Sequence, residues 1–221
     1  MKSISCVICA YNEVDRIRII LDVVTVHPLL TEVIVVNDGS TDATLALLAH
    51  YPSIRVVSYA PNRGKTYALG RGIREATGEL IMLLDADLTG ITAEDISTLA
   101  APVLEERADV SFSLRSNSLW IYRMLGLDFV TGERVLPRPL AQAFMEESEH
   151  LPRWGGEVCM NRLLIEQKLS LAVVRWSHVL NVRKYKKLGR LEGMKEEMRM
   201  IRDAVSVLTP LGALHQNAQL L

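Results

Sequence analysis

Two aspartates one residue apart, Asp85 and Asp87, directly follow an apolar run at residues 80–84. Such a run predicts a buried strand, and residues i and i+2 at a strand end point to the same side. Two carboxylates about 6 Å apart repel each other by roughly 3 kcal/mol at an effective dielectric constant near 20. A divalent cation relieves this repulsion, and Mg²⁺ and Mn²⁺ prefer oxygen ligands. The pattern predicts a metal site that could bridge to a diphosphate; the alternative is a simple turn or helix cap.

Polar side chains also follow three other strand-like runs, at residues 11–13, 37–42 and 62–65. Ligands of parallel sheets bind beyond the carboxyl ends of the strands, so these residues are further candidates for chemistry. Tyr11 offers a flat apolar ring on which a base could stack, and Asp38 could accept a hydrogen bond from a base or a ribose hydroxyl. Lys65, at a predicted helix start, could face a phosphate. Gly39 and Gly64 would permit tight turns or a close approach of the backbone.

An alternation of strands and helices must position these residues. Apolar, β-branched runs predict buried strands, and apolar residues at spacings of three and four predict helices. The predicted strands are residues 3–10, 32–36, 54–59, 80–84, 110–114 and 171–176, and the predicted helices are 14–26, 42–50, 65–76, 92–107 and 155–168. The pattern Thr92-x-x-Asp95 predicts a capping box. The alternation predicts an α/β fold with one mostly parallel sheet flanked by helices on both faces.

The composition of the 221 residues excludes several classes of protein. Hydrophobic residues make up 49% and charged residues 23%, which is typical of a globular domain and unlike a disordered or collagen-like chain. The net charge of −1 argues against a protein that coats nucleic acid, and no apolar run is long enough to cross a bilayer. Cys6, Cys9 and Cys159 are expected to be buried reduced thiols, with a Cys-x-x-Cys redox pair as the alternative. With no signal-peptide pattern at the start, we expect a cytoplasmic protein.

The charge is unevenly distributed along the chain. Residues 1–161 hold 14 Lys and Arg against 21 Asp and Glu, whereas residues 162–202 hold 11 against 4. Basic and apolar residues alternate at helical spacing between 184 and 208, which predicts a basic amphipathic C-terminal helix. That helix could lie on the anionic inner face of a membrane, or pack on the rest of the chain or on a second subunit. The largely apolar stretch 207–221 could also pack against a partner, as in a homodimer.

Four of these motifs occur in the order and spacing of a known enzyme family. They are residues 7–13, 33–42, 62–65 and 83–88, with the sequences VICAYNE, VIVVNDGSTD, NRGK and LLDADL. Over residues 3–115 the chain resembles family 2 glycosyltransferases of the GT-A fold. Cys9 stands where that family usually has proline and Asn37 where it often has aspartate, but neither change removes Asp38 or the paired aspartates.

The resemblance implies a nucleoside diphosphate sugar as donor. It identifies Asp85-Ala86-Asp87 as the DxD motif of the family, with Asp87 as the direct ligand of Mg²⁺ or Mn²⁺. The residues that it places around the nucleotide sugar are Ala10, Tyr11, Glu13, Asp38, Gly39, Asn62, Gly64, Lys65, Asp85, Ala86 and Asp87. Of these, Tyr11, Glu13 and Asp38 would lie near the base and the ribose.

The second half of the chain resembles a narrower group of enzymes. Residues 132–140 are similar to an acceptor-side segment of polyprenyl- and dolichyl-phosphate sugar transferases and of glucosyl-3-phosphoglycerate synthases. Arg134 and Arg138 could clamp a phosphate of the acceptor, or they could be two surface arginines. Glu157 is the candidate general base, or else a favourable charge at a helix start. His178 matches the histidine that often completes the metal site of GT-A enzymes, or is an ordinary hydrogen-bonded histidine.

The sequence thus predicts a metal-dependent glycosyltransferase, in which Asp87 and Glu157 carry the chemistry. The acceptor would be a hydroxyl or a phosphate, such as a lipid phosphate or a phosphoglycerate-like molecule. Residues 1–180 would form the GT-A domain, with a nucleotide-sugar half (1–115) and an acceptor half (116–180), and residues 181–221 a helical extension. We expect inversion, although the phosphoglycerate relatives retain configuration. Two alternatives stay open: a nucleotidyltransferase, and a module that binds nucleotide sugars without catalysis.

Overall fold

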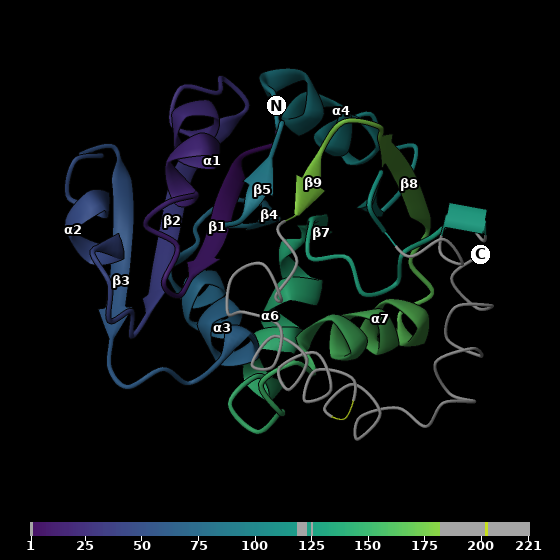
Figure 1. Cartoon of the computed structure of the whole chain (residues 1–221). Helices are drawn as coiled ribbons and strands as arrows, with labels where there is room; N and C mark the ends of the chain where they lie inside the picture. Colours follow the sequence, from purple (N-terminus) through teal and green to yellow (C-terminus); the bar gives the residue numbers. More distant parts are fainter. Residues whose placement is uncertain (1, 119–122, 125, 182–201, 203–221) are drawn as a thin grey trace.

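A seven-stranded sheet forms the centre of the computed structural model, which describes residues 2–118, 123–124, 126–181 and 202 (Figure 1). Its strands lie in the order β3-β2-β1-β4-β7-β6-β8. All neighbours pair in parallel except β7, which runs antiparallel to both β4 and β6. The predicted mostly parallel sheet is therefore confirmed. The strands are β1 (Ile4–Ala10), β2 (Leu30–Asp38), β3 (Ile54–Tyr59), β4 (Leu80–Asp85), β6 (Val110–Arg115), β7 (Arg134–Pro137) and β8 (Leu171–Trp176).

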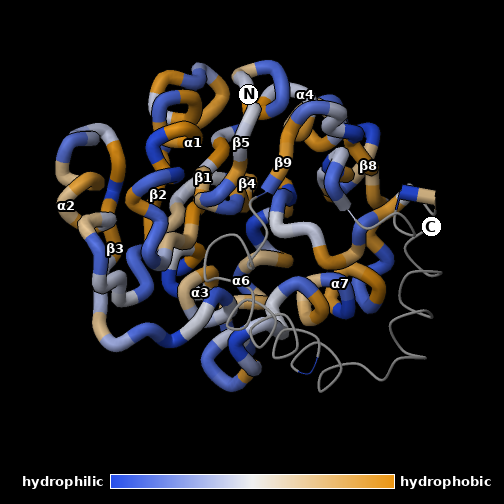
Figure 2. Tube along the Cα trace, in the orientation of Figure 1, coloured by the Kyte–Doolittle hydropathy of each residue, from blue (hydrophilic) through white to orange (hydrophobic). Residues whose placement is uncertain are grey.

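Helices cover both faces of this sheet. On one face lie α1 (Ile17–Val24), α2 (Thr44–Leu48) and α4 (Ala93–Leu104), and on the other lie α3 (Lys65–Glu75), α6 (Arg138–Glu147) and α7 (Gly156–Glu166). Successive residues of β1 alternate between the two cores: Cys6 and Ile8 pack on the α1 side, whereas Val7 packs on the α3 side. Figure 2 shows hydrophobic and hydrophilic stretches alternating along the helices, as expected for helices that bury one face.

Local sequence signals explain where several helices begin. The capping box predicted for α4 is present, because Thr92 accepts from the Asp95 backbone N–H and Asp95 accepts from the Thr92 backbone N–H. Helix α3 starts after Gly64, whose φ of 97° favours glycine. Within α3, a Cβ on Gly72 would lie 2.3 Å from Val7 Cγ1, so this glycine lets the helix pack closely on β1.

Three features were not predicted from the sequence. They are the short strand β7, the helix α6 that follows it, and a two-stranded antiparallel sheet made of β5 (Leu88–Thr89) and β9 (Leu180–Asn181). The β5–β9 pair holds the chain directly after the DxD motif. The remaining strands and helices lie at or near their predicted positions, with shorter ends for α1 and α2.

The predicted amphipathic helix 184–208 and most of the proposed extension 181–221 lie outside the described residues. Of the helices that the structure describes, none is both long and apolar enough to cross a bilayer. All three cysteines are free thiols, with Cys6 and Cys159 buried and Cys9 partly exposed.

Candidate active site

The carboxyl ends of the parallel strands bring the predicted donor residues to one edge of the sheet. Strand β1 lies between β2 and β4, and the strand order reverses there, because the chain passes from β1 to β2 on one side and from β4 to β6 on the other. In the register, Cys9 is opposite Asp85 on β4, and Ala10 is opposite Asn37 on β2. Tyr11, Asp38 and the DxD turn therefore follow directly from three adjacent strands.

Lys65 occupies the centre of this edge, between two carboxylates. Its Nζ atom lies 2.7 Å from Asp85 Oδ1 and 2.8 Å from Glu157 Oε1. Burial alone would lower the pKa of Lys65, but Asp85 and, after it, Glu157 raise that pKa above its ordinary value. The ammonium therefore stays charged at neutral pH. We predicted Lys65 to face a phosphate; the structure places it between the donor-side Asp85 and the candidate base Glu157.

A second set of hydrogen bonds fixes the two helix starts that carry Lys65 and Glu157. The backbone N–H and the hydroxyl of Thr66 both donate to the carbonyl oxygen of Arg153, at 3.1 Å and 2.9 Å. The N–H of Gly156 donates to Thr66 Oγ1 at 3.0 Å. The first turns of α3 and α7 are thereby locked together. Glu157 is buried in this contact, at 7% exposure.

Asp38 fixes the turn that leads into α3. Its carboxylate accepts hydrogen bonds from the N–H groups of Arg63 (2.7 Å) and Gly64 (2.8 Å) and from Asn62 Nδ2 (2.8 Å). Gly39 is needed beside this turn, because its φ is +68° and a Cβ there would lie 2.6 Å from the Asn62 nitrogen. We predicted Asp38 to face a base or ribose. The described contacts give it another task, which is to hold the 62–64 turn against the end of β2.

The loop after β1 presents an aromatic ring to solvent. Tyr11 is 44% exposed, whereas Ala10 before it is buried. Asn12, with φ of +55°, anchors the loop, because its Oδ1 accepts from the Thr41 N–H at 2.8 Å. Glu13 is buried and pairs with Arg16 at 2.5 Å. The Tyr11 ring is accessible for stacking on a flat ligand.

A buried ion pair between Arg115 and Glu133 adjoins Asp85. Arg115, the last residue of β6, donates to Glu133 Oε1 at 2.5 Å and also lies 3.8 Å from Asp85 Oδ2. Glu133 is fully buried and accepts from the hydroxyls of Ser113 (2.6 Å) and Thr131 (2.7 Å). Burial raises the pKa of Glu133, and the charge of Arg115 opposes that rise.

The late start of β7 makes room for this ion pair. Strand β7 begins at Arg134, opposite Leu83, and therefore does not extend alongside Asp85, which lies two residues further along β4. Gly132 fills part of the gap, since a Cβ built on it would lie 2.5 Å from Asp85 Oδ1. Residues 132–140 were predicted to lie on the acceptor side. That Gly132 and Glu133 support the DxD motif was not predicted. Their polar and glycine character directly before a strand was the available signal.

The structure does not bring Arg134 and Arg138 together. Arg134 is fully buried, where it donates to Asn161 Oδ1 (2.7 Å) and to the carbonyl oxygens of Thr131 (2.8 Å) and Phe129 (2.9 Å). Burial lowers the pKa of Arg134 to about 10. Arg138 follows β7 and donates to the Gly78 carbonyl oxygen, before the start of β4. Four residues of extended chain separate Arg134 from Arg138, which is roughly 13 Å at about 3.3 Å per residue. The expected two-arginine clamp therefore has no common site in the described structure.

His178 lies between β8 and β9, beside the start of α4. Its Nε2 atom is 3.0 Å from Oδ2 of Asp95, the same carboxylate that closes the α4 capping box. Its carbonyl oxygen adjoins Gly90, five residues after Asp85. In the described part of the chain, no three His, Cys, Asp or Glu side chains are close enough to hold a metal ion.

The donor set at the DxD turn fits a hard divalent cation. Asp85 and Asp87 are both partly buried at the end of β4, and both offer only oxygen ligands. Mg²⁺ commonly binds one or two protein carboxylates and takes its other ligands from phosphates and water. Asp85 faces Lys65 and Arg115 at this turn.

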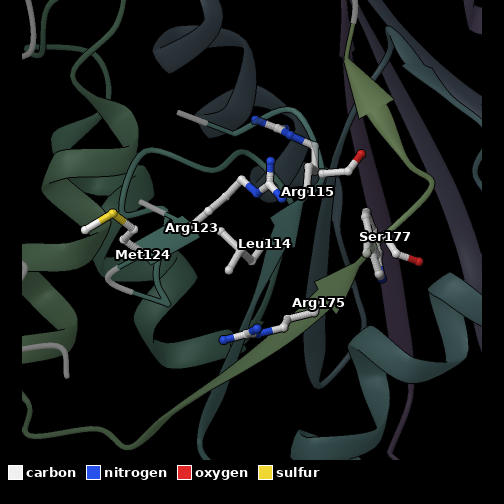
Figure 3. A pocket seen from close by; sticks show the side chains of 8 residues that line it. Leu114, Arg115, Arg123, Met124, Arg175 and Ser177 are labelled. Atoms are coloured by element: carbon white, nitrogen blue, oxygen red, sulfur yellow. The ribbon is translucent and has the colours of Figure 1, made fainter. Parts of the chain in front are cut away.

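A pocket of about 610 Å³ opens beside Arg115 (Figure 3). Its walls carry three arginines and one tryptophan together with smaller apolar and polar side chains: Leu114, Arg115, Ser116, Arg123, Met124, Arg175, Trp176 and Ser177. Within the part of the chain that the structure describes, Arg115 Nε and Trp176 Nε1 are buried donors that have no hydrogen-bond partner. Unpaired donors next to three positive charges favour an anionic ligand. This pocket was not predicted, because residues 115, 123 and 175 are distant in the sequence and the pairing of β6 with β8 brings two of them together.

Comparisons with known proteins agree with this architecture. The model of the family described as "Glycosyl transferase family 2" matches residues 5–120. The dolichyl-phosphate beta-glucosyltransferase of Trichomonas vaginalis is 34% identical over 149 residues, covering 56% of this chain and 44% of that protein. The undecaprenyl-phosphate 4-deoxy-4-formamido-L-arabinose transferase of Yersinia pestis is 36% identical over 126 residues, covering 53% and 38%. The chain thus spans less than half the length of these curated relatives.

Solved structures extend the likeness over more of the chain. Glucosyl-3-phosphoglycerate synthase of Mycobacterium tuberculosis, in complex with Mn²⁺, uridine-diphosphate-glucose and phosphoglyceric acid, aligns with a TM-score of 0.69 at 24% identity. The alignment covers 93% of this chain and 79% of that one, and it supports the predicted GT-A fold. Because the family model spans more than half of the residues, the chain belongs to glycosyl transferase family 2.

Proposed function

We propose that this chain transfers a sugar from a nucleoside diphosphate sugar to a phosphorylated acceptor. One observation carries the proposal: a single side chain, Arg115, lies 3.8 Å from Asp85 of the DxD turn and also lines the three-arginine pocket. A site for a metal-bound diphosphate and a site for a second anion are thus adjacent at the same edge of the sheet. The named activities of the relatives, which act on lipid phosphates or phosphoglycerate, support an acceptor that carries phosphate.

On the donor side, Asp87 would hold the divalent cation together with the diphosphate. Mn²⁺ or Mg²⁺ supplies charge stabilisation for the leaving diphosphate when it is bound. Tyr11 offers its exposed ring to the base. Asp85 and Lys65 orient the sugar end of the donor, because their carboxylate and ammonium can bond to sugar hydroxyls.

On the acceptor side, the pocket takes the place of the expected Arg134–Arg138 clamp. Arg115, Arg123 and Arg175 supply the positive charge for a phosphate. Leu114, Met124 and Trp176 provide apolar walls for the carbon skeleton of the acceptor. If that skeleton is a lipid, the predicted basic helix at 184–208 would contact the membrane surface peripherally; that segment and a homodimer remain proposals outside the described residues.

Glu157 has a role that depends on the acceptor. A hydroxyl acceptor must lose a proton as it attacks the anomeric carbon, and Glu157, whose carboxylate pairs with Lys65, would take it in an inverting reaction. A phosphate acceptor is already ionised and needs no base, so Glu157 would then only orient groups through Lys65. Glu157→Gln therefore separates the two acceptor types: it should slow transfer to a hydroxyl by about 100-fold or more and transfer to a phosphate oxygen much less.

The proposal is tested by product analysis with purified protein. A panel of nucleoside diphosphate sugars is first screened by thermal shift with Mn²⁺, Mg²⁺ or EDTA, because a ligand of the folded state raises the melting temperature. The donor that binds is then incubated with a polyprenyl phosphate, 3-phosphoglycerate or an unphosphorylated alcohol. We expect nucleoside diphosphate and a glycosylated phosphorylated acceptor, both lost with EDTA and in Asp87→Asn. Pyrophosphate release would indicate a nucleotidyltransferase instead, and donor binding without turnover of any acceptor would indicate a binding module.

A further inference from the structure

Arg115 is shared between two places where ligands of opposite charge are expected. Its Nη1 atom contacts Glu133 and lies 3.8 Å from Asp85 Oδ2, while its Nη2 atom lies 4.0 Å from Asp128 Oδ2. The Nε–H on the same guanidinium is buried without a partner among the described residues, and the side chain lines the pocket. The residue is only 7% exposed, so water screens its charge poorly.

We propose that Arg115 couples the two sites, so that an anion in the pocket raises the affinity of the DxD turn for a divalent cation. The inference rests on the proposed function, since it needs a cation at Asp87 and an anion in the pocket. A cation that approaches Asp85 meets the positive charge of Arg115 and is repelled. An anion bound in the pocket that Arg115 lines offsets this charge and reduces the repulsion.

The buried ion pair explains why the charge of Arg115 can be offset while the side chain stays in place. Glu133 holds Nη1 and is itself held by Ser113 and Thr131, so the guanidinium keeps its position beside Asp85. Coupling of this kind is reciprocal: the cation must raise the affinity for the anion by the same factor. The acceptor would therefore bind best after the donor and its metal, and each substrate would favour the other.

Among the described residues, Lys65 and Arg175 are cations near the two sites that lack this double position. Lys65 faces Asp85 but does not line the pocket. Arg175 lines the pocket from β8, which is three strands away from β4 in the sheet, or roughly 14 Å at about 4.8 Å per strand. Arg175 is also exposed, so its charge is better screened. It therefore provides a matched control, because it carries the same charge in the same pocket without the contact to Asp85.

The experiment measures Mn²⁺ binding by the electron paramagnetic resonance signal of free Mn²⁺, with and without saturating glycerol 3-phosphate as the anionic probe. In the wild-type chain we expect the anion to lower the Mn²⁺ dissociation constant about tenfold. Arg115→Gln should bind Mn²⁺ without the anion about as tightly as the wild type does with it, and the anion should add little. Arg175→Gln should weaken the anion yet keep the tenfold effect at saturation.

The possible outcomes distinguish failure of the coupling from failure of the proposed function on which it rests. If Mn²⁺ and the anion both bind the wild type but do so independently, the coupling is wrong and the proposed function stands. If the anion tightens Mn²⁺ binding equally in Arg115→Gln, direct attraction between the two ligands explains the effect and the inference fails. No Mn²⁺ binding in any sample, including a sample with nucleoside diphosphate present, would overturn both. If Arg115→Gln fails to fold, the double variant Arg115→Gln/Glu133→Gln, which removes both buried charges, is measured in its place. It should show the same loss of coupling.

Discussion

Lys65 and Glu157 form an ion pair of 2.8 Å that joins the first turn of α3 to the first turn of α7. The pair connects the predicted nucleotide-sugar half of the chain (1–115), which contains α3, to the predicted acceptor half (116–180), which contains α7. Asp85 shares the same ammonium, so one cation balances a carboxylate from each half.

Replacing this cation should damage both stability and activity. In Lys65→Met, the carboxylates of Asp85 and Glu157 both lose the ammonium that they share. We expect the free energy of unfolding to fall by roughly 2 kcal/mol and kcat/KM to fall by about 100-fold. Urea denaturation and donor-dependent release of nucleoside diphosphate measure the two effects. Lys2→Met, which breaks an exposed pair with Glu106, is the control for loss of one lysine charge; equal losses in both variants would refute a special role for Lys65.

A methyl group on Gly132 should displace the DxD motif. Gly132→Ala places a Cβ where 2.5 Å separates it from Asp85 Oδ1, so the carboxylate must move. We expect donor binding with Mn²⁺ to weaken by about tenfold or more, which corresponds to roughly 1.4 kcal/mol. The effect should be much smaller in an Asp85→Ala background, because the clashing group is then absent. Additive losses in the double variant would show that Gly132 acts elsewhere.

Two arginine variants distinguish the pocket from the clamp that the sequence suggested. Arg175→Gln removes a charge from the pocket, so the KM of a phosphorylated acceptor should rise about tenfold with little change in kcat. Arg138→Gln should leave that KM unchanged, because its guanidinium bonds to Gly78 at the other edge of the sheet. Steady-state kinetics with varied acceptor gives both values. The reverse pattern would restore the clamp and reject the pocket.

The loop that contains Asp42, after β2, should contribute less stability to the fold in acid. Burial alone would raise the pKa of Asp42, but hydrogen bonds from the Thr44 hydroxyl and backbone and from the Val14 backbone lower it below its ordinary value of 3.8. A carboxyl whose pKa is lowered by folding contributes stability above its unfolded pKa and loses it as pH falls through the folded pKa. The stability advantage of the wild type over Asp42→Asn should therefore be full at pH 6 and shrink below about pH 4. Denaturation curves between pH 3 and 6 test this, with exposed Asp15→Asn as the control for charge alone.

Much of the fold could be predicted from the sequence because its signals are local. The apolar runs that form β1, β4 and β6, and the capping box of Thr92 and Asp95, each lie within a dozen residues. Strand β7 has only four residues and begins with an arginine, so no alternation could reveal it. Its first residue, Arg134, is buried because it stacks over the ring of Phe112 at 4.1 Å and donates a hydrogen bond to Asn161. Both of these residues are distant in the sequence.

The candidate site divides in the same way. Asp85 and Asp87 could be identified because a charged pair directly follows an apolar strand. The pocket residues Arg115, Arg123 and Arg175 could not, because each has an ordinary sequence context and only the pairing of β6 with β8 unites two of them. Asp38 was found, but its hydrogen bonds to the 62–64 turn depend on how β2 and β3 are placed, which the sequence does not state.

The reversed direction of β7 has a consequence for how such a domain can change. Because β7 runs antiparallel to β4 and β6, its first residue, Arg134, lies toward the edge of the sheet at which β4 and β6 end. The predicted donor motifs lie at the ends of β1, β2 and β4, whereas the pocket is lined by residues of β6 and β8 and by Ser116, Arg123, Met124 and Ser177. If the proposed function holds, substitutions in that second group would alter which acceptor is admitted while the nucleotide sugar is still held as before. The two specificities would then diverge separately, with the contact between Asp85 and Arg115 as the place where they meet.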